Sequence, residues 1–220
     1  MKGTRHNGRS GKNGVYNPLH NDRRFNPEHS EHIDNERVRQ NIYWDCYQGY
    51  TTMEDQGKEN NFSFEQIELA FYEEHYGNYV MKQNERHVKA RHPDRCKEVE
   101  DVWKNKKTCP EESIYQLGTI DEHASVETLI LVFDEFKKEF DERFGSNVHI
   151  IDWSLHMDEA TPHIHERDVY RYLKTLSGRQ NQKQPCGYLS LISSFLDLEV
   201  QIQVLPMLFP VSAQFLHIGL

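Results

Sequence analysis

The chain has 220 residues, of which 36% are hydrophobic and 28% are charged, and its mean hydropathy is -0.84. This length suits one domain of ordinary size with some additional residues. The composition excludes an integral membrane protein, and the basic start of the chain is not followed by an apolar stretch, so we expect no secretory signal and a cytoplasmic location. The formal net charge of -9 argues against a nucleic-acid partner unless cations are concentrated locally.

Cationic side chains are indeed concentrated near the start of the chain. Residues 1–24 contain six Lys and Arg residues but only one acidic residue, Asp22. Residues 1–17 are rich in Gly, Asn and Arg and nearly free of apolar side chains, which predicts a flexible basic N-terminal segment. A local patch that faces DNA is therefore compatible with the acidic chain as a whole.

Two helices are predicted from apolar periodicity. Aromatic and aliphatic residues recur near helical spacing over residues 64–76, directly after Ser63, which is a suitable N-cap. A second apolar stripe, dominated by Phe, lies between Ser125 as N-cap and Gly145 as C-terminal stop. We expect the Phe row to be core rather than a binding surface.

Several strands are predicted around these helices. Residues 38–44 give a weak strand signal, and residues 113–120, 148–155 and 163–170 give clearer ones. A turn-like sequence joins the last two, so we expect them to pair as a hairpin. The expected fold class is α+β, an antiparallel sheet with flanking helices, over a core of residues 18–170.

The sequence changes character after this core. Residues 171–220 form an atypical tail with few charges, and its end, residues 200–220, carries no charged side chain. Gln and Pro interrupt the apolar run, so we do not expect a membrane span. A disordered, truncated or frame-shifted end is the preferred interpretation. The four cysteines include no C-x-x-C pair and are expected to be free thiols.

The main chemical signal is a run of ten residues, 156–165, that contains three histidines and two carboxylates. His163 and His165 are two positions apart, so both imidazoles point to one face of a strand, and the turn brings His156 alongside them. Three convergent imidazoles suit a divalent transition metal and leave positions free for a substrate oxygen. The alternative is a polar surface hairpin.

Two carboxylates lie within the same run. Glu159 is a candidate either for a direct site role, as ligand or proton acceptor, or for orienting an imidazole from outside the metal's coordination shell. Asp158 is interpreted as a turn residue.

The run H-x-D-E-x-T-P-H-x-H resembles the metal motif of the Mob/Pre (MobV-type) plasmid mobilisation and recombination relaxases, and His163-Ile164-His165 is similar to the signature of the HUH endonuclease superfamily. A second segment, His20-Asn21-Asp22-Arg23, resembles the H-N-[ED]-R motif of those relaxases. The resemblance covers roughly residues 20–170. It implies an HUH relaxase-like fold, incomplete at the C-terminus because the family's helical continuation is missing, and hence a truncated member.

The resemblance also implies an activity. The enzyme would be a DNA relaxase, an endonuclease and strand transferase that nicks single-stranded or hairpin plasmid origin DNA. His20 would be the nucleophile, with Tyr16 as its rival, and would form a covalent histidine-DNA intermediate. Manganese or magnesium would be bound by His156, His163 and His165. The residues expected to bind DNA are Asn21, Arg23 and Arg24.

Two alternatives remain open from the sequence. A hydrolase of small phosphoesters would use the same three histidines without requiring His20, and a remnant of a relaxase would bind DNA without cleaving it. A homodimer is known in the family, but this chain lacks the continuation that supports it.

Overall fold

A computed structural model describes residues 3–7, 18–25, 30–105 and 108–170. All of the described helices and strands belong to one compact unit. The expected tail of residues 171–220 lies outside the described residues. None of the helices in the described ranges combines the length and apolar character that crossing a bilayer requires.

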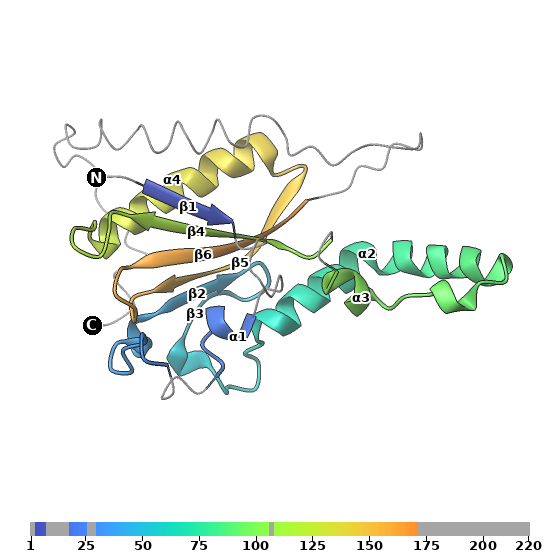
Figure 1. The fold of residues 1–220 in the computed structure, drawn as a ribbon, viewed down its shortest axis with the longest axis horizontal. Helices are drawn as coiled ribbons and strands as arrows, with labels where there is room; N and C mark the ends of the chain where they lie inside the picture. The colour runs from blue at the N-terminus through green and yellow to red at the C-terminus, as the bar shows by residue number, and fades with distance from the viewer. Residues whose placement is uncertain (1–2, 8–17, 26–29, 106–107, 171–220) are drawn as a thin grey trace. The chain divides into compact units, whose positions relative to one another are not determined.

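The centre of the fold is a six-stranded sheet in the order β1-β4-β6-β5-β2-β3, in which every neighbouring pair is antiparallel. The fold is the predicted α+β arrangement, with helices flanking an antiparallel sheet (Figure 1). The strands are β1 (Gly3–Asn7), β2 (Ile42–Asp45), β3 (Gly49–Thr52), β4 (Glu111–Leu117), β5 (Val148–His156) and β6 (His163–Tyr170).

The α-helices of the described ranges lie at the edges and faces of this sheet. They are α1 (Pro18–Asn21), α2 (Phe64–Lys89), α3 (Val99–Trp103) and α4 (Val126–Phe144), with short 3-10 turns η3 (Val38–Gln40), η4 (Met53–Asp55) and η5 (Pro93–Arg95). Figure 1 shows α1 beside the first turns of α2, and the outer half of α2 extending beyond the sheet. The segment through η5 and α3 returns along α2. The side-chain amide of Asn84 holds it there, since it donates a hydrogen bond to the Lys97 carbonyl oxygen and accepts one from the Lys97 backbone N–H.

Both predicted helices are confirmed with their caps. The Ser63 hydroxyl accepts a hydrogen bond from the backbone of Gln66, and the Ser125 hydroxyl accepts one from that of Thr128. Gly145 caps the end of α4. The first helix is longer than predicted, because its outer turns are polar and give no apolar periodicity to read.

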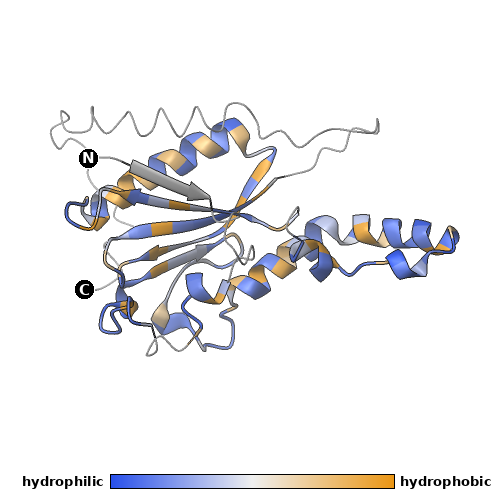
Figure 2. Ribbon diagram, viewed as in Figure 1, coloured by the Kyte–Doolittle hydropathy of each residue, from blue (hydrophilic) through white to orange (hydrophobic). Residues whose placement is uncertain are grey.

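Helix α4 and the helices α2 and α3 cover opposite faces of the sheet. Phe133 contacts Trp153 and Phe136 contacts Tyr115 on the α4 face, where Figure 2 shows alternating hydrophobic and hydrophilic residues along the helix. On the other face, a core cluster joins α2 and α3 to Ile151 and Val169. Within it, the buried Glu68 carboxylate accepts hydrogen bonds from Arg167 of β6 and Trp103 of α3, at 3.1 and 2.6 Å.

The β5–β6 hairpin is confirmed, and its register matters for the site. His156 is paired directly with His163, and Ser154 is paired with His165. The register shifts between Ile150 and Asp152, which is a β-bulge. Because strand side chains alternate, the three histidines face the side of the sheet that α2 covers.

Other strand predictions were close but not complete. Residues 38–40 form a 3-10 turn and only residues 42–45 form β2, because the polar Arg39 and Gln40 do not continue the alternation. Strand β4 ends at Leu117, where Gly118 has φ +102° and where a Cβ atom would meet the Glu122 carbonyl oxygen at 2.2 Å. Residues 3–7, expected to be flexible, form edge strand β1 through backbone pairing with β4 that apolar patterning does not reveal.

Candidate metal centre

The three predicted imidazoles meet at one point. The ring centroids of His156, His163 and His165 lie 4.8–5.3 Å apart, and the three residues are at most 8% exposed. This burial excludes the alternative of a solvated surface hairpin.

Each imidazole is held by one ring nitrogen, which leaves the other for the centre of the cluster. His156 Nε2 lies 2.8 Å from the Asn21 carbonyl oxygen, His163 Nδ1 lies 2.8 Å from that of Thr161, and His165 Nδ1 lies 2.9 Å from Glu112 Oε1. Each of these acceptors requires a proton on the nitrogen that it contacts. The remaining nitrogens therefore present lone pairs inward, in the arrangement typical of metal-binding histidines.

The inward nitrogens fit a cation. His156 Nδ1 is buried and has no hydrogen-bond partner within the described chain, and His163 Nε2 and His165 Nε2 are 3.1 Å apart. Two lone pairs at this distance repel each other unless a proton or a metal ion lies between them. The residues present thus suit a divalent metal bound by His156, His163 and His165.

The surroundings keep two of these imidazoles uncharged. Burial, followed by the charges of His165 and Arg23, lowers the pKa of His156 well below its ordinary value. Burial and the neighbouring His165 lower the pKa of His163 in the same direction. Neutral imidazole is the form that binds a metal.

Glu159 lies between the histidines and the N-terminal motif. Its carboxylate oxygens are 3.9 Å from His156 Nδ1, 3.9 Å from His163 Nε2 and 3.8 Å from His20 Nε2. Burial raises its pKa, but the hydrogen bond from Arg23 and the charge of His163 outweigh this effect and lower it. Glu159 is therefore an anion that faces both the three histidines and His20. This position is compatible with a direct role in the site and with orienting an imidazole.

His20 of α1 completes the cluster. Its ring centroid lies 5.7 Å from that of His156 and 5.6 Å from that of His165, and its side chain is 35% exposed. Among the described residues, two sets have ligand atoms within 4.8 Å of one another: His20, His156 and His165, and His156, Glu159 and His163. Burial, then the charges of Arg23 and His165, lower the pKa of His20 to about 4.

Arg23 is placed differently from the DNA contact expected of it. Its guanidinium is buried and donates to both oxygens of Asp158, at 2.8 and 2.9 Å, and to Glu159 Oε1 at 2.6 Å. A third nitrogen donates to the His20 carbonyl oxygen and lies 3.2 Å from His20 Nε2. These contacts occupy the group that a phosphate would need, so the structure supports a positioning role for Arg23.

The other two residues expected to bind DNA also make internal contacts. Asn21 is buried, and its side-chain amide donates to Glu112 Oε1 at 3.1 Å. Arg24 contacts Asn61 and lies 3.4 Å from Asp22 Oδ2, with about a quarter of its side chain exposed. A phosphate contact by Arg24 stays a prediction, whereas the burial of Asn21 gives it a structural role.

Sequence reasoning missed two carboxylates of this site. Asp158 was interpreted as a turn residue, but it is fully buried and holds Arg23, 135 residues away in the chain. Glu112 faces His165 because β4 pairs with β6, and only the strand register reveals that neighbour. Asp22 contributes in another way, since its carboxylate accepts a hydrogen bond from the backbone of Phe64 and so fixes the start of α2 beside the motif.

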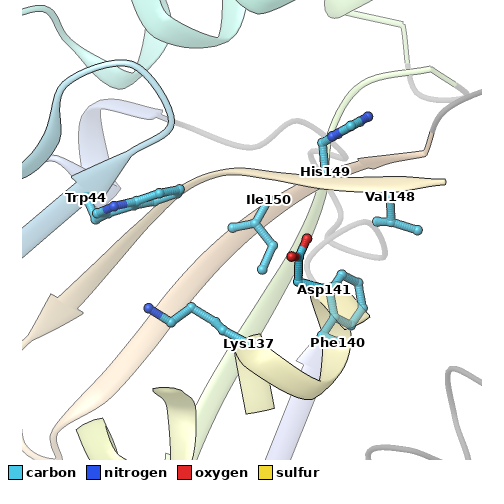
Figure 3. Close-up of a pocket in the computed structure, with 7 residues that line it drawn as sticks. All are labelled: Trp44, Lys137, Phe140, Asp141, Val148, His149 and Ile150. Atoms are coloured by element: carbon cyan, nitrogen blue, oxygen red, sulfur yellow. The ribbon is translucent and has the colours of Figure 1, made fainter. Parts of the chain in front are cut away.

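A separate shallow pocket lies on the α4 side of the sheet. Lys137, Phe140 and Asp141 of α4 line it, together with Trp44 and β5 residues (Figure 3). Figure 3 shows Ile150 pointing toward α4, whereas His149 points to the other face of β5. This pocket shares no residue with the histidine cluster.

The fold and the cluster define an α+β protein with a candidate divalent-metal centre and a further neutral histidine beside it. The family model described as plasmid recombination enzyme (Mob_Pre) matches residues 52–185, more than half of the chain, and the chain belongs to this family. No curated protein sequence matches the chain.

Two solved structures are similar to this one. Both are manganese-bound crystal structures of the MobM relaxase domain (MOBV; Mob_Pre) bound to plasmid pMV158 oriT DNA. The structure at pH 6.8 has 19% sequence identity and a TM-score of 0.50, over 98% of this chain and 97% of the other. The structure at pH 4.6 has 18% identity and a TM-score of 0.48, over 98% of each chain. The first supports the fold described above.

Proposed function

We propose that this protein is a metal-dependent relaxase, which nicks one strand of plasmid origin DNA and later rejoins it through a covalent histidine-DNA intermediate. The observation that carries the proposal is the neutral, partly exposed His20 imidazole placed against the His156–His163–His165 cluster. Membership of the plasmid recombination family and the DNA and manganese bound by the similar relaxase domain support it.

The reaction needs a nucleophile that conserves the energy of the phosphodiester bond. A ring nitrogen of His20 attacks the scissile phosphorus, so that an N–P bond to the 5′ end forms and the bond from phosphorus to the 3′ oxygen breaks. The 3′ oxygen leaves and takes up a proton as a hydroxyl. Rejoining is the reverse attack by that hydroxyl.

The chain's own residues prepare this step. Burial and the charge of Arg23 keep His20 unprotonated, which leaves a lone pair for the attack. Arg23 also fixes the His20 backbone, while Glu159 is placed to accept the ring proton that His20 loses after the N–P bond forms. A divalent ion held by the three histidines would polarise the phosphate oxygens and offset the negative charge of the transition state.

Manganese is the better candidate for this ion. Magnesium prefers oxygen ligands and keeps several waters, whereas three imidazole nitrogens suit a transition metal.

The test is incubation with supercoiled plasmid that bears a candidate origin, with and without manganese. We expect relaxation by the wild type and by His123→Ala, an exposed control, but none by His20→Ala or His163→Ala. Relaxation by His163→Ala equal to that of the wild type would remove the metal hypothesis.

The same experiment separates the alternatives. A covalent adduct that is released by acid identifies a phosphohistidine bond, whereas an acid-stable adduct that is lost in Tyr16→Phe identifies the tyrosine. Cleavage of small phosphoesters by His20→Ala would favour a hydrolase, and DNA binding without any nicking would favour a non-catalytic remnant.

A further inference from the structure

The outer end of α2 and the turn that follows it form a basic surface, here called the arm tip and defined as residues 82–97. It contains six cationic residues and only two acidic ones, a net charge of +4 in a chain whose net charge is -9. All six cations are exposed: Lys82, Arg86, Lys89, Arg91, Arg95 and Lys97. Figure 2 shows the outer turns of α2 as mostly hydrophilic.

The cations of the arm tip are arranged together and are available. Lys82, Arg86 and Lys89 are four and then three positions apart on α2, so they lie on one face of the helix. None of the six makes an ion pair within the parts of the chain that the structure describes. By contrast, exposed cations elsewhere, such as Lys104 and Arg143, are paired with a carboxylate one turn away.

The arm tip is a fixed distance from the candidate metal centre. The first residue of α2, Phe64, is hydrogen-bonded to Asp22 of the His20 motif, and the helix then runs continuously to Lys89. At 1.5 Å per residue, this length carries the tip about 38 Å along the helix axis. One turn of B-form DNA is of similar length, about 34–36 Å.

We infer that the arm tip binds the phosphate backbone of duplex DNA, about one helical turn from the strand that is cut. The inference rests on the proposed function for its geometry. Unpaired Lys and Arg side chains recognise phosphates without reading the base sequence. Because the rest of the chain is acidic, this local concentration of cations would be a principal source of sequence-independent affinity.

The test measures binding of the full chain to a fluorescent duplex of mixed sequence, about 24 base pairs long, over a series of salt concentrations. The variant Arg86→Gln/Lys89→Gln removes two tip charges, and Lys138→Gln/Arg143→Gln removes two exposed charges from α4 as a control. Gln is a good helix former, so circular dichroism should show intact helices in both.

Two lost phosphate contacts should make the dependence of log affinity on log salt less steep by about 1 to 2, and lower the affinity about tenfold near 0.1 M salt. The charge-conserving variant Arg86→Lys/Lys89→Arg should bind as the wild type does. An unchanged salt dependence, or equal losses in the tip and α4 variants, would overturn the inference.

Failure here differs from failure of the proposed function. If the wild type nicks origin DNA and the tip variant binds duplex DNA normally, only the proposed DNA binding by the arm tip is refuted. If the wild type binds duplex DNA through the arm tip but does not nick origin DNA, only the proposed relaxase activity is refuted.

Discussion

Glu112 connects the two halves of the site although it belongs to neither motif. Its Oε1 atom is within hydrogen-bonding distance of both His165 Nδ1 and the side-chain amide of Asn21. Burial raises the pKa of Glu112, but the hydrogen bond and charge of His165, together with the charge of Arg167, outweigh this effect and bring it to about 2. An anion at this position fixes the orientation of the His165 ring and makes its inward nitrogen more basic.

Replacing Glu112 should therefore weaken metal binding without removing a ligand. We expect Glu112→Gln to lower manganese affinity about 10–100-fold, the range typical of partners that orient a metal ligand. Titration calorimetry measures the change, and Glu135→Gln, an exposed substitution on α4, is the matched control. Equal affinities in Glu112→Gln and the wild type would show that the carboxylate does not support His165.

Residue-level prediction from the sequence succeeded where spacing decides geometry. His163 and His165 are two residues apart, which places both side chains on one face of any strand. The proximity of their imidazoles could therefore be predicted from the spacing alone. Arg23 and Asp158 are 135 residues apart, and no local pattern tells a buried ion pair from a basic loop and an acidic turn. Contacts of this kind depend on the register of the folded chain.

Helix α4 shows the same distinction at the scale of an element. Its caps and its Phe stripe are local signals, and both predicted the helix correctly. Within the stripe, Phe140 is 2% exposed and packs between Phe136 and Phe144, with ring centroids 5.5 Å from each. The partners on the sheet depend on tertiary packing and could not be read from the helix.

Removing one member of this stripe should destabilise the whole domain. We expect Phe140→Ala to cost about 3–5 kcal/mol of unfolding free energy, because a buried aromatic side chain leaves a cavity. Leu131→Ala on the same helix, where the side chain is 61% exposed, should change it by about 0.5 kcal/mol or less. Urea denaturation compares the two, and similar midpoints would mean that the Phe row is not core.

At the scale of the whole molecule, three histidines with lowered pKa values make the free energy of unfolding depend on pH. His20, His156 and His163 all bind protons less readily in the folded chain than in the unfolded one. Between the unfolded value of 6.5 and the folded value of about 4 for His20, the unfolded state holds more protons. Stability contributed by these groups is present above pH 6.5 and is lost as the pH falls through this window.

The metal-free protein should therefore become less stable as the pH is lowered from 7 to 5. Urea denaturation at each pH measures this loss, which should be smaller in His20→Asn and unchanged in the exposed control His92→Asn. Manganese should raise the midpoint at pH 7, since a ligand that binds only the folded state stabilises it. Constant stability between pH 7 and 5 would contradict the linkage.

The β-bulge in β5 has a consequence for the two sides of the sheet. The side chains of Val148 and Ile150 point toward α4. Ile151 is the extra residue of the bulge, and beyond it the side chains of Asp152, Ser154 and His156 all face α2. The bulge thus changes which alternate positions face α2. One strand can therefore contribute side chains to the core at one end and to the candidate metal centre at the other. Under strict alternation two residues six positions apart share a face, so only the bulge allows Ile150 to pack toward α4 while the His156 imidazole lies in the candidate metal centre on the α2 side.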